Sequence, residues 1–308
     1  MKKTLLYMLV AVSLLPVPAY TSVSSDAPKT GVFERTEGIL DSLYQEASAS
    51  YVMNEPVSSR VSFYANIFLA EKSPYVVDPL GEGEAGDVSK GPLYRFDGFD
   101  CTTFVETVLA LALSSDSRQF KQTLNKIRYK DGRISYKTRN HFPSVDWIPN
   151  NSKAGFVKDI TGAIAGGKTK WSQTWIEKDN WFRMKGTDFL EMSRGFKKEL
   201  GKIPYISKED LKDNPALEDH IPSGTIFHVV RPNWNLKKAI GTELDVSHMG
   251  FLIRENGVLY MVHASNGVRD GSNDYKGVKK EALRDYVERV MMSSSTMAGF
   301  NILRIQER

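Results

Sequence analysis

The first part of the chain carries hydrophobic residues at the spacing of amphipathic helices. In residues 34–49 apolar side chains recur three and four positions apart, and residues 57–70 repeat this spacing. Residues 101–113 are almost continuously apolar, and residues 117–127 follow as a further helical segment. The sequence therefore predicts four helices in this part of the chain.

The pattern changes to that of β-strands after Pro222. Apolar and β-branched residues gather in short runs, and Asn256-Gly257 joins two of these runs with a sequence typical of a two-residue hairpin. Helices followed by an antiparallel sheet indicate an α+β fold. We expect strands at residues 225–230, 247–254, 258–263 and 300–305, and a helix at residues 281–290.

The middle of the chain is less regular. Residues 73–97 are rich in glycine and proline, which predicts a long loop that leads to position 100. A short strand is expected at residues 133–137, and a polar, aromatic loop at residues 140–152. Residues 153–212 have a mixed pattern. Their tryptophans favour packing over a lip around a groove, and they are Trp171, Trp175 and Trp181.

Composition and charge exclude one class of partner. Of 308 residues, 41% are hydrophobic and 25% are charged, which is ordinary for a soluble globular protein. The formal net charge is +4, and removing Lys2 and Lys3 leaves +2. So small a charge argues against a nucleic-acid surface as the main function.

The N-terminus predicts export. Lys2 and Lys3 precede an apolar run at residues 4–15, and small residues lead to a cleavage site after Ala19. Because a transmembrane helix needs roughly 20 apolar residues, this run is too short to span a bilayer. We therefore expect a signal peptide at residues 1–19 and a periplasmic or secreted protein without a membrane anchor. Residues 20–308 are expected to form a single catalytic domain and a monomer.

Cys101 is the only cysteine, and it begins the apolar segment 101–113. A helix N-terminus lowers the pKa of a cysteine, so this position favours a reactive thiolate. An exported chain with one cysteine cannot form an internal disulfide. The sulfur is therefore expected to be either reactive or buried and inert.

Two of the five histidines are placed to serve such a cysteine. His248 and His263 lie on the two arms of the expected hairpin, 263 − 248 = 15 residues apart. Folding about the turn pairs position 248 with about 265, which makes His263 a diagonal neighbour of His248. A nucleophilic cysteine needs a base, and the base needs an orienting partner. His228 is expected to be a core residue. The histidine spacing does not fit a zinc site, so neither a metal nor another cofactor is expected.

Four motifs in order resemble those of the NlpC/P60 cysteine peptidases. They are Ser73-Pro74-Tyr75, Asp100-Cys101-Thr102-Thr103-Phe104-Val105, His248-Met249-Gly250-Phe251-Leu252-Ile253 and Val262-His263-Ala264-Ser265. The resemblance implies a papain-like core in which the cysteine at a helix N-terminus packs on an antiparallel sheet. It also implies Cys101 as nucleophile, His248 as base and His263 as the residue that orients the base.

The chain departs from ordinary members of that superfamily in two ways. Thr-Thr follows Cys101 where Ser-Gly is usual, and 248 − 101 = 147 positions separate the cysteine from His248. The extra length, an insertion at about residues 130–220, resembles the DUF1460 branch. That branch is similar to N-acetylmuramoyl-L-alanine amidases and implies a muropeptide substrate, with a preference for 1,6-anhydro-muramyl peptides. A stem-peptide endopeptidase and a non-catalytic muropeptide-binding protein remain as alternatives.

Residues that could contact such a substrate come from the resemblance and from the loop at residues 139–151. Donors and an indole face there suit a sugar with acetamido and lactyl groups, although the same side chains could simply pin the loop. The candidates are Tyr75, Asp100, Thr102, Arg139, Asn140, Trp147, Asn150, Asn151 and Ser247.

Overall fold

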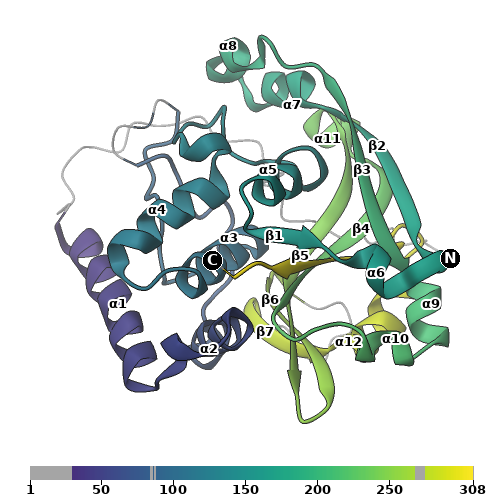
Figure 1. Cartoon of the computed structure of the whole chain (residues 1–308). Coiled ribbons are helices and arrows are strands. Elements are labelled where there is room, and N and C mark those ends of the chain that lie inside the picture. Colours follow the sequence, from purple (N-terminus) through teal and green to yellow (C-terminus); the bar gives the residue numbers. More distant parts are fainter. Residues whose placement is uncertain (1–29, 84–85, 87, 268–274, 308) are drawn as a thin grey trace, which may run out of the picture.

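The computed structural model describes residues 30–83, 86, 88–267 and 275–307 (Figure 1). The expected signal peptide at residues 1–19 lies outside the described residues. Four α-helices lie between residues 30 and 130, as the periodicity predicts, and each begins within four residues of its expected start. They are α1 (Thr30–Ala49), α2 (Val57–Ala70), α3 (Cys101–Ala112) and α4 (Ser117–Arg128).

A mixed fold with an antiparallel sheet is confirmed. The strand order is β2-β3-β8-β4-β5-β6-β7, β1 pairs with β8, and every pairing is antiparallel. The strands are β1 (Val157–Asp159), β2 (Lys170–Glu177), β3 (Lys198–Ser207), β4 (Thr225–Asn235), β5 (Glu243–Glu255), β6 (Val258–Ser265), β7 (Gly277–Ala282) and β8 (Gly299–Ile305).

The inserted segment joins this sheet. Strands β1, β2 and β3 all lie within residues 130–220, and both β1 and β3 hydrogen-bond to the last strand, β8. The long β2–β3 ribbon extends beyond the rest of the sheet toward helices α7 and α8 (Figure 1). The shorter helices of this region and of the C-terminal part are α5 (Ile148–Lys153), α6 (Thr161–Ala165), α7 (Lys178–Lys185), α8 (Leu190–Ser193), α9 (Lys208–Asp213), α10 (Ala216–Asp219), α11 (Lys237–Ile240) and α12 (Leu283–Tyr286).

Two local predictions were wrong, and one predicted helix starts two residues late. The expected strand at residues 133–137 is a turn, because the Thr138 hydroxyl donates to the carbonyl oxygens of Arg133 and Ser135. The expected loop at residues 140–152 is largely helical, with a π-helix at Pro143–Trp147 followed by α5. The expected helix at residues 281–290 is confirmed except at its start: α12 begins at Leu283, because the preceding residues belong to β7, and a π-helix at Val287–Met291 continues it.

Two hydrophobic clusters sandwich the sheet. Helix α3 packs on one face against β5 and β6, with side chains such as Phe104 meeting Phe251 at 5.9 Å between ring centroids. The opposite face buries Phe227, Leu252 and Phe300 beneath α12 and its neighbours. Because each fully buried side chain of this size contributes roughly 1.5–3 kcal/mol, the two clusters fix the sheet between its helical layers.

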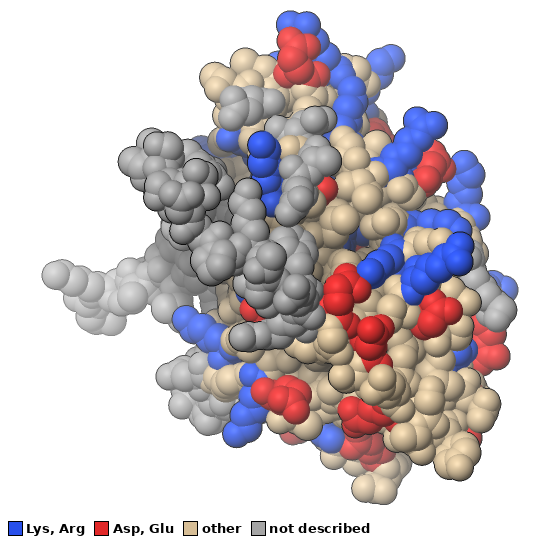
Figure 2. Space-filling model, turned by 90° about the vertical axis from the view of Figure 1, so that its left-hand side faces the viewer, with Lys and Arg blue, Asp and Glu red and all other residues tan. Residues whose placement is uncertain are grey.

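The molecular surface carries no large field of one sign on the side shown in Figure 2, where basic and acidic side chains intermingle. Among the described residues, no helix has the length and hydropathy needed to cross a bilayer.

A buried charged network ties α3 to the elements that follow it. The Arg128 Nε donates to Glu106 Oε2 over 2.6 Å, and the Trp147 Nε1 donates to Glu106 Oε1 over 3.2 Å. Arg128 also donates to the Leu93 carbonyl oxygen, which anchors the long loop that precedes α3. Arg128, Glu106 and Trp147 are almost fully buried. The network therefore holds α3, α4, the π-helix and the loop in one arrangement.

We expect Glu106→Ala to lower the free energy of unfolding by about 3–5 kcal/mol, because it leaves the Arg128 guanidinium buried without its counter-ion. Urea unfolding followed by circular dichroism measures this loss. The control is Lys121→Ala, which breaks the half-exposed pair between Lys121 and Glu37 and should cost less than about 1 kcal/mol. Equal unfolding midpoints for the two variants would contradict the role given to the network.

Candidate active site

Cys101 is the first residue of α3, as the sequence predicts, and a capping box fixes it there. The Asp100 carboxylate accepts from the Thr103 backbone N–H over 2.7 Å, and the Thr103 hydroxyl accepts from the Asp100 N–H over 3.0 Å. The cap thus satisfies the Thr103 N–H, whereas the backbone N–H groups of Cys101 and Thr102 have no acceptor within the helix.

The Cys101 thiol is packed against the sheet and is 9% exposed. It lies 4.0 Å from the Thr102 hydroxyl and beside the backbone N–H of Met249 on β5. Burial, followed by the nearby Asp100 carboxylate, raises the pKa of Cys101 to about 12. The predicted thiolate is therefore wrong for the resting protein, because desolvation outweighs the helix N-terminus.

The two hairpin histidines are in direct contact. The His248 Nε2 and the His263 Nδ1 are 2.6 Å apart. The register pairs Phe251 with Val262 and, continued to the end of β6, sets position 248 opposite 265, as the sequence predicts. His263 is 2% exposed, whereas His248 is only partly buried.

Gly250 makes this contact possible. A Cβ at position 250 would lie 2.7 Å from the His263 Cβ and 2.7 Å from the Phe227 ring. Real Cβ atoms do not approach other atoms so closely, so any side chain here would displace His263. The glycine that follows His248 by two positions is thus explained by packing.

A third residue, Glu281, extends the contact between the two histidines, and the sequence did not predict its role. The Glu281 Oε1 lies 2.8 Å from the His263 Nε2. The sequence placed Glu281 in a helix, but it belongs to β7, where the partner of His263 is Lys279. Glu281 is therefore the diagonal neighbour of His263. Burial alone would raise the pKa of Glu281, but the hydrogen bond and the charge of His263, with Lys279 and Arg289, hold that pKa below its usual value.

His248 is kept neutral by its surroundings. Burial lowers its pKa well below 6.5, and His263, Lys279 and Arg231 lower it further. Among the described residues, no hydrogen bond joins the Cys101 thiol to the His248 ring. The His248 ring lies near Phe227, at 6.0 Å between centroids, whereas the Met249 side chain packs with Cys101 in the cluster beneath α3. The resting site thus holds a neutral thiol beside β5 and a neutral imidazole one residue along that strand.

Some of the predicted contact residues gather around the thiol. The Tyr75 hydroxyl is buried without a hydrogen-bond partner among the described residues, and after burial itself the charges of Cys101 and Asp100 raise the Tyr75 pKa most. The Asp100 charge also acts on Arg139, a partly exposed cation. Ser247 precedes the base and its hydroxyl is likewise buried without a partner in the described part of the chain.

The remaining candidates hold the loop instead. Trp147 is 1% exposed and bonded to Glu106, so its predicted stacking face for a sugar is not accessible. Asn140 and Asn151 both donate to the Ile127 carbonyl oxygen, at 2.9 and 3.0 Å. Asn150 donates to the Asn140 side-chain oxygen over 2.6 Å. Of the two interpretations of this segment, loop pinning accounts for these contacts.

His228 is a core residue, as predicted, and is fully buried against Trp147. Burial lowers the pKa of His228 to about 3. Among the described residues, no group of three or more histidine, cysteine, aspartate or glutamate side chains is arranged to hold a metal ion.

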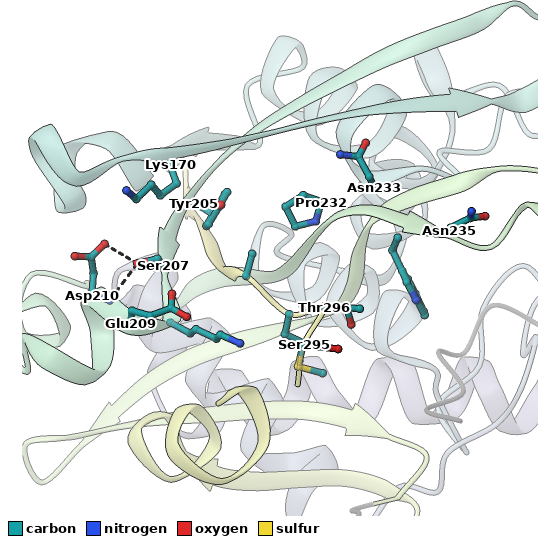
Figure 3. A pocket seen from close by; sticks show the side chains of 14 residues that line it. Lys170, Tyr205, Ser207, Glu209, Asp210, Pro232, Asn233, Asn235, Ser295 and Thr296 are labelled. Atoms are coloured by element: carbon teal, nitrogen blue, oxygen red, sulfur yellow. Dashed lines mark hydrogen bonds between the residues drawn. The ribbon is translucent and has the colours of Figure 1, made fainter. Parts of the chain in front are cut away.

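A separate pocket of about 960 Å³ opens between the β2–β3 ribbon and the end of β4 (Figure 3). Lys170, Tyr205 and Asn233 project from its upper walls, and the segment with Ser295 and Thr296 closes it below. None of the predicted site residues lines it.

Comparison with known proteins gives the family. The model of the AmiA-like family, described as N-acetylmuramoyl-L-alanine amidase-like, matches residues 65–293. The chain belongs to this family. It is an amidase-like hydrolase, and the predicted DUF1460 assignment is confirmed. Among curated proteins, no sequence matches the chain significantly.

Two solved structures are similar over most of this amidase-like chain. A DUF1460 protein from Legionella pneumophila str. Philadelphia 1 is 32% identical, with a TM-score of 0.80 over 89% of this chain and 96% of its own. An N-acetylmuramoyl-L-alanine amidase from Bacteroides uniformis ATCC 8492 is 25% identical, with a TM-score of 0.59 over 82% of this chain and 99% of its own.

The raised pKa of Cys101 predicts slow alkylation by iodoacetamide near neutral pH, because only the thiolate reacts. The rate should rise about tenfold per pH unit from about pH 6 to 9 without a plateau. Mass spectrometry measures it, and every thiol adduct lies on Cys101, the only cysteine. The same protein in urea is the control and should titrate near about 8.5. A plateau below neutral pH in the folded protein would overturn the neutral resting thiol.

Proposed function

We propose that this amidase-like protein is a cysteine amidase that hydrolyses the amide between N-acetylmuramic acid, including its 1,6-anhydro form, and L-alanine in peptidoglycan fragments. The observation that carries the proposal is the capped helix N-terminus with Cys101, placed beside the strand that bears His248 and its partner His263. Family membership supports the substrate class.

The proposed mechanism uses the ring nitrogen of His248 that is not hydrogen-bonded to His263. The His248 Nε2 is occupied by His263, so in this proposal Nδ1 takes the proton of the Cys101 thiol. The ring must come within hydrogen-bond reach of the thiol when substrate binds, because no such bond joins them in the described resting structure. The resulting thiolate attacks the lactyl carbonyl carbon, and the Cys101 backbone N–H stabilises the developing oxyanion. The C–N bond breaks as His248 returns the proton to the leaving amine of L-alanine. Water then hydrolyses the thioester, releases the lactyl carboxylate and restores the thiol.

Binding of the fragment is assigned to polar groups of the predicted site. Tyr75 and Ser247 offer hydroxyls without partners in the described structure, and Thr102 and Asp100 flank the cysteine. Arg139 offers a guanidinium to a carboxylate of the stem peptide, because the residue is partly exposed and its charge acts on Asp100.

We also infer that the chain acts outside the cytoplasm as one catalytic unit. Residues 1–19 serve as the signal peptide in this proposal, and residues 20–308 form the working enzyme with its insertion at about 130–220. The hydrogen bonds of β1 and β3 to β8 support a single unit, because they join the insertion to the C-terminal strand. A papain-like NlpC/P60 ancestry is consistent with the order of helix, insertion and hairpin.

One observation favours a second candidate function. A mostly buried Cys101 with a raised pKa is what a muropeptide-binding protein without turnover would show. The two functions share a ligand but differ in whether bonds are broken, so product analysis separates them.

We expect a digest of an anhydro-muramyl tetrapeptide to yield free tetrapeptide and the bare anhydro sugar, detected by mass spectrometry. A sugar-dipeptide product would instead indicate stem-peptide endopeptidase activity. Unchanged substrate, with measurable binding in a calorimeter, would favour the binding protein. Cys101→Ala should abolish turnover while its circular dichroism spectrum stays native, since it removes the nucleophile. Turnover by this variant at a near-native rate would exclude the mechanism.

The lowered pKa of His248 predicts activity that persists in mild acid. The base must be neutral to accept a proton, so kcat/KM should hold its plateau below pH 6.5 and fall only as pH drops through the lowered pKa. Initial rates in constant-ionic-strength buffers measure this limb. Circular dichroism at each pH is the control for unfolding. A midpoint at or above 6.5 would contradict the neutral resting imidazole.

A further inference from the structure

Three neighbouring strands each contribute one side chain to an unbroken row of hydrogen bonds. His248 comes from β5, His263 from β6 and Glu281 from β7, with contacts of 2.6 and 2.8 Å. The step from His263 to Glu281 is diagonal across the sheet, because Glu281 lies two positions from Lys279, the partner of His263. The β5–β6 register, continued to position 248, makes the step from His248 to His263 diagonal as well. Same-face diagonal neighbours are within reach of long side chains.

The carboxylate at the end of this row fixes which atoms donate and which accept. An ionised carboxylate can only accept, and the lowered pKa of Glu281 keeps it ionised at neutral pH. The His263 Nε2 must therefore carry a hydrogen and donate it. This direction holds for the neutral His263 ring, in which the other nitrogen, Nδ1, is an acceptor, whereas a charged ring would donate from both nitrogens.

The acceptor role of the His263 Nδ1 in turn fixes the donor on the His248 ring. Because the His263 Nδ1 accepts, the His248 Nε2 must be the donor in the contact between the two rings. His248 is neutral, so its Nδ1 is left with a free lone pair. That nitrogen is the one the proposed mechanism uses as the base. A row built without an obligate acceptor at its end could run in the opposite direction and leave Nδ1 protonated.

We propose that Glu281 is a positioning residue that sets the tautomers of both histidines and so keeps the His248 Nδ1 free to accept the thiol proton. It also supplies a buried negative charge to the imidazolium that forms after proton transfer, through His263. Glu281 touches neither substrate nor thiol in this role. The proposal rests on the proposed amidase function for its kinetic part, whereas its tautomer part can be measured without a substrate.

The test compares Glu281→Gln with the unmodified enzyme. Glutamine keeps the shape of the side chain and can still accept a hydrogen bond, but it carries no charge and can also donate. The donor and acceptor atoms of the two histidines are then no longer fixed. We expect kcat on the muropeptide to fall by about 10- to 100-fold, with KM within about twofold, because the residue acts through the base and not through binding.

Long-range ¹H–¹⁵N NMR of the histidine rings is the readout that a merely structural role would not move. In the unmodified protein we expect His248 and His263 to carry their hydrogens on Nε2, and in Glu281→Gln we expect mixed tautomers for both. His228 serves as an internal reference, since it is fully buried and belongs to no step of the row. The matched control is Glu255→Gln, which changes a carboxylate of the same sheet that pairs with Lys280 at 2.7 Å. It should leave the spectra of His248 and His263 unchanged.

Two results would overturn the proposal. One is a hydrogen on the His263 Nδ1 in the unmodified protein, and the other is an unaltered pair of tautomers in a folded Glu281→Gln variant. If Glu281→Gln does not fold, the spectrum of the unmodified protein still decides, because it shows the direction of the row directly. If the tautomers change as expected but no amide bond is cut, the proposed function fails while the role of Glu281 in the row stands.

Discussion

Close packing of the α3 N-terminus against β5 is the constraint on which the candidate site depends. The capping box fixes the first residue of the helix, and the Glu106 network anchors the helix to α4 and the loops around it. The same packing removes water from Cys101 and raises its pKa. The Cys101 thiol therefore has a defined position but is neutral, so it requires a base to remove its proton during the reaction.

The base is built from the sheet alone. Adjacent antiparallel strands place His248, His263 and Glu281 in a diagonal row, and Gly250 leaves the space in which the His263 ring sits. Because strands are held by many backbone hydrogen bonds, such a row is more rigid than one carried by loops. The neutral thiol and neutral imidazole then suit general-base attack on an amide, with charge developing only as the proton moves. An ion pair at rest would instead require a lowered pKa for Cys101 and a raised pKa for His248, the opposite of what burial does to each.

The insertion shows how an added segment can be absorbed by an existing sheet. Its strands extend the sheet beyond β8, and the π-helix and α5 within it supply Trp147 and Asn151, which pin the start of the segment to α3 and α4. These side chains, which the sequence suggested for sugar binding, therefore hold the segment in place instead. The unpartnered hydroxyl of Tyr75 lies near the thiol and the cation of Arg139 acts on Asp100, which leaves recognition to groups near the helix terminus.

Local patterns in the sequence determined the four early helices, the Asn256-Gly257 hairpin and its register, and the pairing of Cys101 with His248 and His263 as candidates. These features depend on periodicity, turn chemistry and spacing, which neighbouring residues fix. Only the tertiary structure decided that Trp147 is buried, that Cys101 is neutral and that Glu281 ends the histidine row. Each of those facts depends on desolvation or on contact between strands distant in sequence, and a pattern of residue types does not contain either quantity.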